Sequence, residues 1–240
     1  SPVVTSKAYD GTTVATITGT LSGVLNSDTV TLVGTGTFAS KNVGANQVVT
    51  STSTLSGAAA GNYALTQPSG LTGTITAKAL STEAPTIASK VYDGTTVAGA
   101  VTVGALSGTV SPETLTVSGT ADAYSSAAVG TYSGVAVTYT LANGGSGNTA
   151  GLASNYSLAA GAATGTITGR SLTVTDVAVT SKAYDGTTSA AITGTLSGVL
   201  NGDDVTLVGT GTFASKNMGA NQVVTSTSTL SGLAAGNYTL

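Results

Sequence analysis

The chain has 240 residues, and Asp, Glu, Lys and Arg make up only 7% of them, against about a quarter in typical soluble proteins. Its formal net charge is −3 with seven basic residues, which argues against a nucleic-acid partner, and no apolar run approaches the ~20 residues of a membrane-spanning helix. His is absent, so the commonest general base and metal ligand is missing, and the absence of Cys removes all thiol chemistry. We therefore expect no enzyme, no cofactor and no metal. Without a long apolar run we also expect no membrane insertion.

The first predicted element is a turn within residues 6–13, Ser-Lys-Ala-Tyr-Asp-Gly-Thr-Thr, where Gly11 can take the positive φ of a tight turn. Residues 28–33 follow as a strand, because apolar and polar side chains alternate. Asn62-Tyr63 and the strand-like Gly73-Thr74-Ile75-Thr76 come next. Thr and Val favour strands while Gly and Ser favour turns, so the composition also predicts an all-β chain.

The same elements return along the chain. Later copies lie at residues 89–96 and 181–188 for the opening motif, at 155–156 and 237–238 for the Asn-Tyr pair, and at 165–168 for Gly-Thr-Ile-Thr. The third copy therefore lacks its last strand.

This recurrence predicts three modules: repeat 1 (residues 1–80), repeat 2 (residues 81–172, diverged and longer) and repeat 3 (residues 173–240). Repeats 1 and 3 are close to identical. Aligned from Val4 and from Val179, they differ at seven of 62 positions.

Within repeat 2, Val135, Val137, Tyr139 and Leu141 alternate with smaller residues, a period of two that is typical of a strand with one apolar face. Short strands separated by Gly-rich turns, in modules of this size, indicate tandem immunoglobulin-like antiparallel β-sandwich modules. A β-grasp-like module is the alternative, weakened by the lack of a convincing helix.

Residues of the two repeated motifs form the candidate structural site. We expect the tyrosines to be buried core anchors with hydrogen-bonded hydroxyls, and Asp and Asn to satisfy backbone groups at turns. The motif residues are Lys7, Tyr9, Asp10, Gly11, Asn62 and Tyr63 in repeat 1, Lys90, Tyr92, Asp93, Gly94, Asn155 and Tyr156 in repeat 2, and Lys182, Tyr184, Asp185, Gly186, Asn237 and Tyr238 in repeat 3.

The polar residues allow two other roles, an isopeptide bond and a calcium site. A Lys–Asn isopeptide bond between the motifs would need a buried acid beside the pair. Calcium would need several carboxylates, and the best cluster is Asn201, Asp203 and Asp204; because repeat 1 has Thr29 in place of Asp204, we expect no shared calcium site.

The opening Ser-Lys-x-Tyr-Asp-Gly-Thr-Thr and the closing Asn-Tyr…Gly-Thr-Ile-Thr resemble the YDG repeats, and the related MBG-type repeats, of very large secreted adhesins of Gram-negative bacteria, including filamentous-haemagglutinin-like proteins. The resemblance covers the whole chain. It implies an extracellular repeat region that extends a surface protein, forms fibres or biofilm matrix, and adheres. It implies no catalytic residues and no particular ligand.

Two functions remain open at this point. The first is a structural stalk or filament module, and the second is a module that binds a glycan or a host protein. Six of the nine tyrosines belong to the repeated motifs, which favours the stalk, and Tyr124 is the first candidate for a ligand contact. We expect the chain to be an internal piece of a secreted or cell-surface protein whose export signal lies elsewhere.

The missing strand of repeat 3 predicts the partners. A sandwich without one strand has an open edge that accepts a strand from another segment. We therefore expect neighbouring copies of the repeat to join head to tail into a fibre, with repeat 3 completed by residues beyond Leu240 or by a neighbouring subunit.

Overall fold

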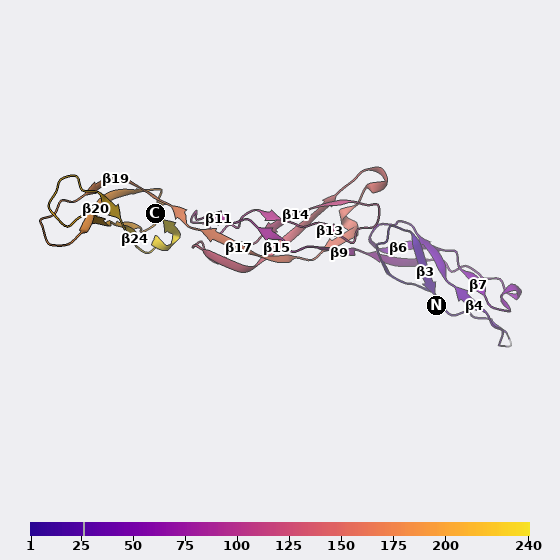
Figure 1. The fold of residues 1–240 in the computed structure, drawn as a ribbon. Coiled ribbons are helices and arrows are strands. Elements are labelled where there is room, and N and C mark those ends of the chain that lie inside the picture. Colours follow the sequence, from indigo (N-terminus) through magenta and orange to yellow (C-terminus); the bar gives the residue numbers. More distant parts are fainter. Residues whose placement is uncertain (26) are drawn as a thin grey trace. The chain divides into compact units, whose positions relative to one another are not determined.

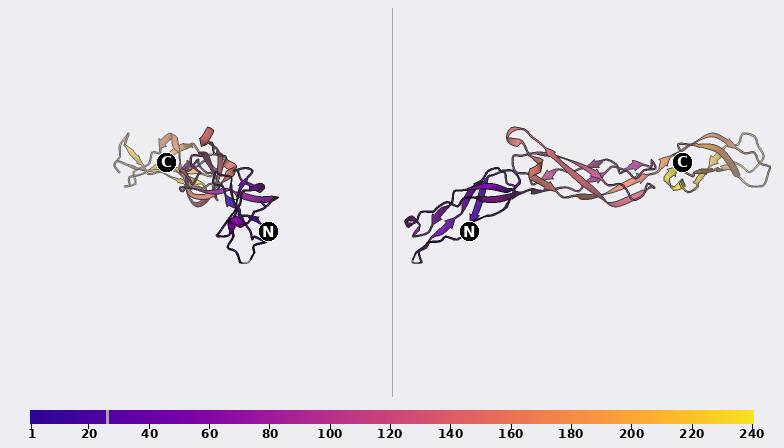
Figure 2. Two further views of the ribbon diagram at one scale, coloured as in Figure 1. Left: turned by 90° about the vertical axis from the view of Figure 1, so that its right-hand side faces the viewer. Right: turned by 180° about the vertical axis from the view of Figure 1, so that it is seen from behind.

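The computed structural model describes residues 1–25 and 27–240 (Figure 1 and Figure 2). Short strands and 3-10 turns of three residues each make up its regular structure, so the predicted all-β fold class is confirmed. In the described part of the chain, no helix is long and apolar enough to cross a membrane.

The chain folds as two compact units whose division runs through repeat 2. Unit 1 contains Ser1–Glu83, Val103–Ser118 and Tyr139–Ala160, and unit 2 contains Ala84–Thr102, Gly119–Thr138 and Gly161–Leu240. The expected module boundaries near Leu80 and Leu172 therefore each lie inside a unit, because the two ends of repeat 2 pack against different repeats.

In unit 1, repeat 1 is built on a six-stranded sheet in the order β1-β3-β5-β6-β8-β2. Neighbouring strands are antiparallel except for the short parallel pair of β2 and β8, and β4 and β7 form a separate antiparallel pair. The elements are β1 (Val3–Val4), β2 (Lys7–Ala8), β3 (Val14–Thr18), β4 (Thr31–Val33), β5 (Thr35–Phe38), β6 (Gly44–Ser51), β7 (Thr54–Ser56), the 3-10 turn η1 (Ala60–Asn62) and β8 (Leu71–Thr76).

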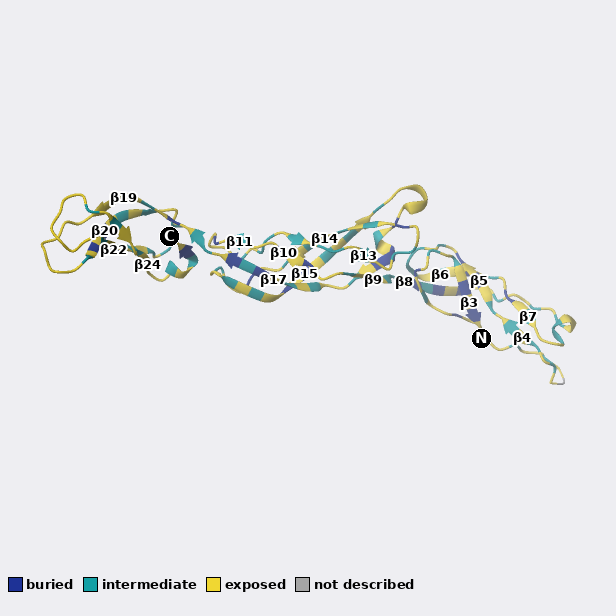
Figure 3. Ribbon diagram, in the orientation of Figure 1, coloured by how far each residue is buried: buried dark blue, intermediate teal, exposed yellow. Residues whose placement is uncertain are grey.

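The core of repeat 1 follows from strand periodicity. In β3, Ala15 and Ile17 are buried while Val14, the residue before Ala15, is 62% exposed, because successive side chains of a strand face opposite sides. Phe38 and Ile75 complete the core, and Figure 3 shows buried positions scattered among exposed ones along these strands.

The last strand, β8, fits this core only because it carries a glycine. A Cβ on Gly73 would lie 2.6 Å from Val4 Cγ1 and 2.8 Å from Phe38 Cε1. The glycine lets the backbone of β8 approach the Phe38 ring, and Ile75, which has no exposed surface, fills the space two residues later.

A single residue, Ala77, separates β8 from the next strand, β9. One stretch of chain thus closes repeat 1 and opens repeat 2, where β9 pairs with β13 antiparallel and with β16 parallel. The further elements of unit 1 are β9 (Lys78–Thr82), β13 (Leu106–Ser107), η2 (Gly147–Thr149), η3 (Ala153–Asn155) and β16 (Tyr156–Leu158).

Unit 2 holds the other end of repeat 2. Its sheet has the order β11-β17-β15-β14, and β10 pairs with β12 beside it. The division between the units falls within β14 and β15. The strands are β10 (Thr86–Ile87), β11 (Lys90–Val91), β12 (Val101–Thr102), β14 (Leu115–Ala121), β15 (Gly130–Asn143) and β17 (Gly161–Thr168).

Repeat 3 completes unit 2 with a smaller sheet in the order β19-β20-β22-β23. β21 pairs with β24, and β18 pairs with β25 in parallel, as β9 does with β16. The elements are β18 (Arg170–Ser171), β19 (Thr173–Val179), β20 (Ser189–Ser197), β21 (Thr206–Val208), β22 (Thr210–Phe213), β23 (Val224–Ser226), β24 (Thr229–Ser231), η4 (Ala235–Asn237) and β25 (Tyr238–Thr239).

Candidate functional site at the repeat junctions

The motif tyrosines of neighbouring repeats meet at a shared carboxylate. In unit 1, the rings of Tyr9 (repeat 1) and Tyr156 (repeat 2) pack edge to face, with centroids 5.3 Å apart and planes at 77°. Tyr9 donates its hydroxyl proton to Glu113 Oε1 at 2.5 Å, and Tyr156 donates to Glu113 Oε2 at 2.7 Å. All three residues are at most 8% exposed, so the junction is a buried polar cluster whose members satisfy one another.

The opening motif places Tyr9 at this junction through a tight turn. Asp10 Oδ1 accepts a bond from the Thr12 N–H at 2.8 Å, and the Lys7 amine holds both Asp10 at 2.8 Å and the Thr12 carbonyl at 2.9 Å. Gly11 takes φ 78°, and a Cβ there would lie 2.9 Å from Val110 Cγ1 of repeat 2. Only glycine suits both the turn and the close approach of the next repeat.

The second half of the junction is held mainly by residues of repeat 2, together with the strand β9 at the boundary between the repeats. The Tyr156 hydroxyl, besides donating to Glu113, accepts a bond from the Val110 N–H at 3.1 Å. β16 begins at Tyr156 and is held by its parallel pairing with β9. The Tyr156 ring is therefore held by Val110, Glu113 and the pairing of β16, in addition to its packing on Tyr9.

Burial controls the electrostatics of this cluster. Burial, and then the bond to Glu113, raises the pKa of Tyr9 to about 12. Burial and Glu113 likewise raise the pKa of Tyr156 to about 12, against the opposing effect of the Val110 N–H. Burial alone would raise the pKa of Glu113, but the bonds from Tyr9, Tyr156 and Lys41 outweigh it and lower the pKa. At neutral pH the tyrosines are thus neutral donors to a carboxylate anion.

Asn155 makes a second set of hydrogen bonds across the same junction. Its Oδ1 accepts a bond from the Val43 N–H at 2.9 Å, and its Nδ2 donates to Asn42 Oδ1 at 2.9 Å. Asn155 is 1% exposed, and Lys41 nearby donates to Glu113 Oε1 at 3.2 Å. The asparagine of one repeat therefore caps the backbone of the previous repeat.

Unit 2 contains the same junction between repeats 2 and 3. Tyr92 and Tyr238 pack edge to face, 5.4 Å apart at 77°, and both hydroxyls donate to Asp203 Oδ2. Asn237 Oδ1 accepts a bond from the Val129 N–H at 2.9 Å, as Asn155 does from Val43. Burial followed by the bond to Asp203 raises the pKa of both Tyr92 and Tyr238.

The two outermost motifs each show one half of this arrangement. In repeat 1, the Tyr63 hydroxyl donates to Asp28 Oδ2 at 2.7 Å and accepts from the Leu25 N–H at 3.0 Å, but the ring is only half-buried and Asn62 is exposed. In repeat 3, Tyr184 is 62% exposed.

The expectation that all six motif tyrosines are buried is therefore wrong for Tyr184 and only partly right for Tyr63. Burial of these rings requires the neighbouring repeat. The remaining four motif tyrosines are each at most 6% exposed: Tyr9, Tyr92, Tyr156 and Tyr238.

The contacts of the motif lysines and of Asp203 bear on the isopeptide bond and the calcium site. The amines of Lys7, Lys90 and Lys182 lie in their own opening turns, within hydrogen-bond distance of threonine carbonyls, and Asn155 bonds to repeat 1 instead, which argues against a Lys–Asn isopeptide bond. Asp203 belongs to the second junction. Within residues 1–25 and 27–240, no cluster of three or more acidic side chains could hold a metal ion.

Tyr124, proposed as an exposed ligand contact, is 3% exposed, so that expectation is wrong. Its ring stacks on Tyr132 with centroids 4.8 Å apart. A Cβ on Gly165 would lie 2.2 Å from the Tyr124 hydroxyl, so Tyr124 packs on β17 as Phe38 packs on β8.

The junction acids were missed by sequence reasoning. Asp28 and Asp203 both lie 35 residues before the second tyrosine of their repeat, which was a detectable signal. Glu113 is a different residue type and lies 43 residues before Tyr156, because repeat 2 carries the insertion around residues 143–148. That change of type and spacing hid the pattern.

Comparison with known families agrees with the three-fold recurrence. The family model described as YDG domain matches residues 1–70, 76–165 and 168–240. No curated protein and no solved structure matches the chain.

Proposed function

This chain belongs to the YDG-domain family, and we propose that it serves as an extracellular structural repeat of a bacterial surface adhesin, acting as a stalk or matrix filament. The observation that carries the proposal is the recurrence of one junction. Tyr9, Glu113 and Tyr156 in unit 1 have the same contacts as Tyr92, Asp203 and Tyr238 in unit 2.

The chemistry of the junction supports cohesion between repeats. Edge-to-face aromatic pairs contribute about 0.5–1.5 kcal/mol beyond their buried area, and hydrogen bonds to an ionised acceptor are stronger than neutral ones. Every polar group of the first cluster already has a partner inside the protein: Tyr9, Tyr156 and Glu113 bond to one another. Mutual bonding of this kind supports a role in holding the repeats together.

The proposal of an extracellular location rests on the sequence. Large secreted adhesins carry repeats with the same paired motifs, and a chain without Cys crosses an oxidising compartment without forming stray disulfides. Secretion or attachment at the cell surface is thus part of the proposal. The alternative is a module that binds a glycan or a host protein. Tyr124, the first candidate for a ligand contact in that alternative, is buried and does not support it.

Small-angle X-ray scattering of the full chain tests the stalk function. If junctions fix neighbouring repeats, the wild-type chain gives a narrow distribution of intramolecular distances. The double variant E113A/D203A removes both carboxylates and should broaden that distribution, while D28A, which alters an acid outside either three-residue junction, should not. Identical distributions for the wild type and E113A/D203A would contradict the proposal, as would a specific glycan ligand whose binding is unaffected by E113A/D203A.

A further inference from the structure

One turn of repeat 3 carries both groups that bond to the Tyr238 hydroxyl. The Leu200 N–H donates to that hydroxyl at 3.0 Å, and the hydroxyl donates to Asp203 Oδ2. The Asp203 N–H closes the turn by donating to the Leu200 carbonyl at 3.2 Å. The two residues between them are Asn201 and Gly202, so this dipeptide sets the spacing of the two groups that hold Tyr238.

The Asn201-Gly202 dipeptide is exposed and unhindered. Gly202 has φ 93°, the left-handed value that the third residue of a type II turn requires, and both residues are exposed to solvent. Within residues 1–25 and 27–240, the Gly202 N–H and the Asn201 side chain have no hydrogen-bond partner. A Cβ on Gly202 would meet no atom within 4 Å, so nothing shields the backbone nitrogen.

We infer that Asn201 is a site of spontaneous deamidation, and that its modification loosens the junction between repeats 2 and 3. The reaction needs a side-chain amide, the backbone nitrogen of the following residue, and water. The modification itself is independent of the proposed structural function. Its effect on the junction rests on that function.

The reaction proceeds through a cyclic succinimide. The Gly202 nitrogen loses its proton to solvent and attacks Asn201 Cγ, so that an N–Cγ bond forms. The Cγ–Nδ2 bond breaks, and Nδ2 takes up a proton and leaves as ammonia. Water then opens the ring. Cleavage of the new N–Cγ bond gives aspartate, and cleavage between the nitrogen and the main-chain carbonyl carbon gives isoaspartate, in which the backbone runs through Cγ.

Both products change the junction. Isoaspartate adds one methylene to the backbone between Leu200 and Asp203, so the turn no longer sets their spacing. Aspartate places a further carboxylate two residues from Asp203, whose anion accepts bonds from Tyr92 at 3.0 Å and from Tyr238. A like charge nearby disfavours that anion. The modified turn therefore holds the two tyrosines less firmly.

The equivalent turn of the first junction cannot react. There Ser111-Pro112 lies between Val110 and Glu113, and the same two kinds of bond hold the Tyr156 hydroxyl. Serine has no side-chain amide and proline has no N–H, so the leaving group and the nucleophile are both missing. Deamidation therefore distinguishes the second junction from the first.

A second Asn-Gly pair, Asn143-Gly144, is held in place by hydrogen bonds. Asn143 Oδ1 accepts a bond from the Ala153 N–H at 2.8 Å, and the Gly144 N–H donates to the Gly151 carbonyl at 3.3 Å. Both bonds must break before the Gly144 nitrogen reaches Asn143 Cγ. The chain thus contains its own control, the same dipeptide in a bonded setting.

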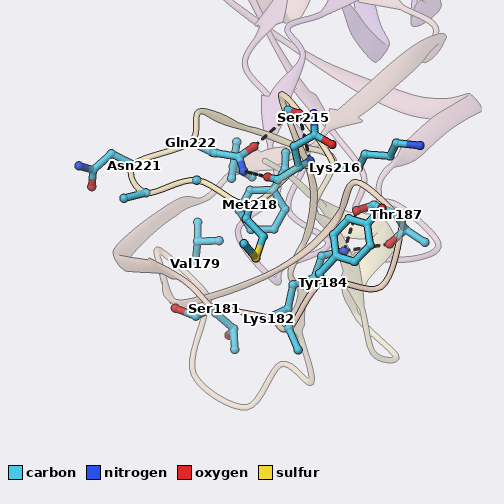
Figure 4. A pocket seen from close by; sticks show the side chains of 17 residues that line it. Val179, Ser181, Lys182, Tyr184, Thr187, Ser215, Lys216, Met218, Asn221 and Gln222 are labelled. Atoms are coloured by element: carbon cyan, nitrogen blue, oxygen red, sulfur yellow. Dashed lines mark hydrogen bonds between the residues drawn. The ribbon is translucent and has the colours of Figure 1, made fainter.

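The Asp-Gly turns of the opening motifs are protected from the same ring closure. In repeat 3, the Lys182 amine bonds to Thr187, as Figure 4 shows, and to Asp185. Asp185 Oδ1 also accepts a bond from the Thr187 N–H at 2.9 Å. These bonds lower the pKa of Asp185 to about 2, and an ionised carboxylate is a poor electrophile. Asp10 and Asp93 make the same contacts in their own turns.

Ageing of the full 240-residue chain tests the site. The chain is kept in mildly alkaline water enriched in the heavy oxygen isotope, and peptide mapping by mass spectrometry follows incorporation of the isotope at each asparagine. We expect Asn201 to react at least about tenfold faster than Asn143, because Asn143-Gly144 must first lose two hydrogen bonds.

Two variants control the chemistry. Asn201→Gln keeps the amide but requires a larger ring, so its reaction should be far slower. Gly202→Ser introduces the residue that repeat 1 has at the equivalent position, Ser27, which takes φ 63° in its turn. The added side chain hinders attack by the backbone nitrogen, so this variant should also react more slowly than the wild type.

Hydrogen exchange on fresh and aged chains tests the effect on the junction. Amide protection in peptides that cover residues 198–204 and 235–240 should fall in step with the modification of the wild type. It should stay constant in Asn201→Gln. Peptides that cover Glu113 and Tyr156 of the first junction are the matched control and should keep their protection.

Each outcome bears on one part of the inference. Equal rates at Asn201 and Asn143, or equal rates for the wild type and Asn201→Gln, would overturn the deamidation site. Complete modification of Asn201 with unchanged protection, or an equal loss of protection at both junctions, would overturn the loosening. The scattering difference between fresh wild type and E113A/D203A is unaffected by these results, so failure of the inference is distinguishable from failure of the proposed function.

Discussion

Repeats 1 and 3 differ at seven of 62 aligned positions, yet their opening tyrosines have opposite environments. Tyr9 is 1% exposed and Tyr184 is 62% exposed. The same local sequence surrounds both rings. β8 and the Asn-Tyr end of repeat 2 pack beside Tyr9, and no equivalent described segment packs beside Tyr184. The opening motif is therefore buried by neighbouring segments and not by its own local fold.

The closing half of the junction behaves in the opposite way. Tyr63 keeps its bonds to Asp28 and the Leu25 N–H although its ring is only half-buried, and Tyr238 makes the same two kinds of bond with Asp203 and Leu200. The acid–tyrosine pair is therefore built within one repeat and needs no partner. One half of each junction is preformed, and the other half becomes buried on contact.

The strongest test of this comparison is tyrosine truncation. Tyr9→Ala removes a buried aromatic ring and the bond to Glu113, and we expect the free energy of unfolding of unit 1 to fall by about 3–5 kcal/mol. Tyr184→Ala removes an exposed ring, and its effect should stay within about 0.5 kcal/mol. Native-state hydrogen exchange, read on peptides from each unit, measures both. Similar losses for the two variants would contradict the comparison.

The next largest effect is expected at the shared acid. Glu113→Gln removes the anion that accepts bonds from Tyr9, Tyr156 and Lys41, and should destabilise unit 1 by about 1.5–3 kcal/mol. Asp28→Asn changes the equivalent acid beside the half-buried Tyr63 and should cost less than half as much. The same exchange measurement compares them, and a larger loss for Asp28→Asn would show that the acid acts within its own repeat and not across the junction.

A smaller difference is expected between the motif asparagines. Asn155→Ala leaves the partly buried Val43 N–H and Asn42 side chain without their partner, at a cost of about 1–2 kcal/mol. Asn62 is exposed, so Asn62→Ala should change the free energy of unfolding by less than about 0.5 kcal/mol. Chemical denaturation of the two variants beside the wild type decides the point; equal effects would mean that the asparagines serve only their own turns.

The sequence was sufficient for features that depend on neighbours along the chain. Period-two alternation in residues 28–33 and in Val135–Leu141 predicted strands, and the structure contains β4, which covers the second half of the first range, and β15. Gly11, Gly94 and Gly186 take φ of 78°, 77° and 76°, the left-handed conformation expected of their turns.

The sequence was insufficient where a residue depends on a distant partner. Burial was expected equally for Tyr9 and Tyr184 because their local sequences match, and the contact that separates them spans 104 residues, from Tyr9 to Glu113. Exposure was expected for Tyr124, but its ring packs on Gly165, which lies 41 positions later in a diverged repeat. The local sequence gives no sign of this contact. Periodicity carries no information about which repeat covers which face.

The smallest expected effect concerns the opening turns, and here the comparison predicts no difference. Asp93 follows the buried Tyr92 and Asp185 follows the exposed Tyr184, yet the bonds from Lys90 and Thr95, and from Lys182 and Thr187, lower the pKa of both carboxyls to about 2. A lowered pKa favours the ionised form in the folded state, so its stabilisation is present above the ordinary value of 3.8 and is lost as pH falls toward 2. Both side chains are about half exposed, so solvent screens these ion pairs and the stability change is small. Carboxyl carbon shifts in NMR, followed from pH 5 to pH 1.5, should give nearly the same midpoint for Asp93 and Asp185. A normal midpoint for Asp185 beside a lowered one for Asp93 would show that the turn, like the tyrosine beside it, is completed only by the next repeat.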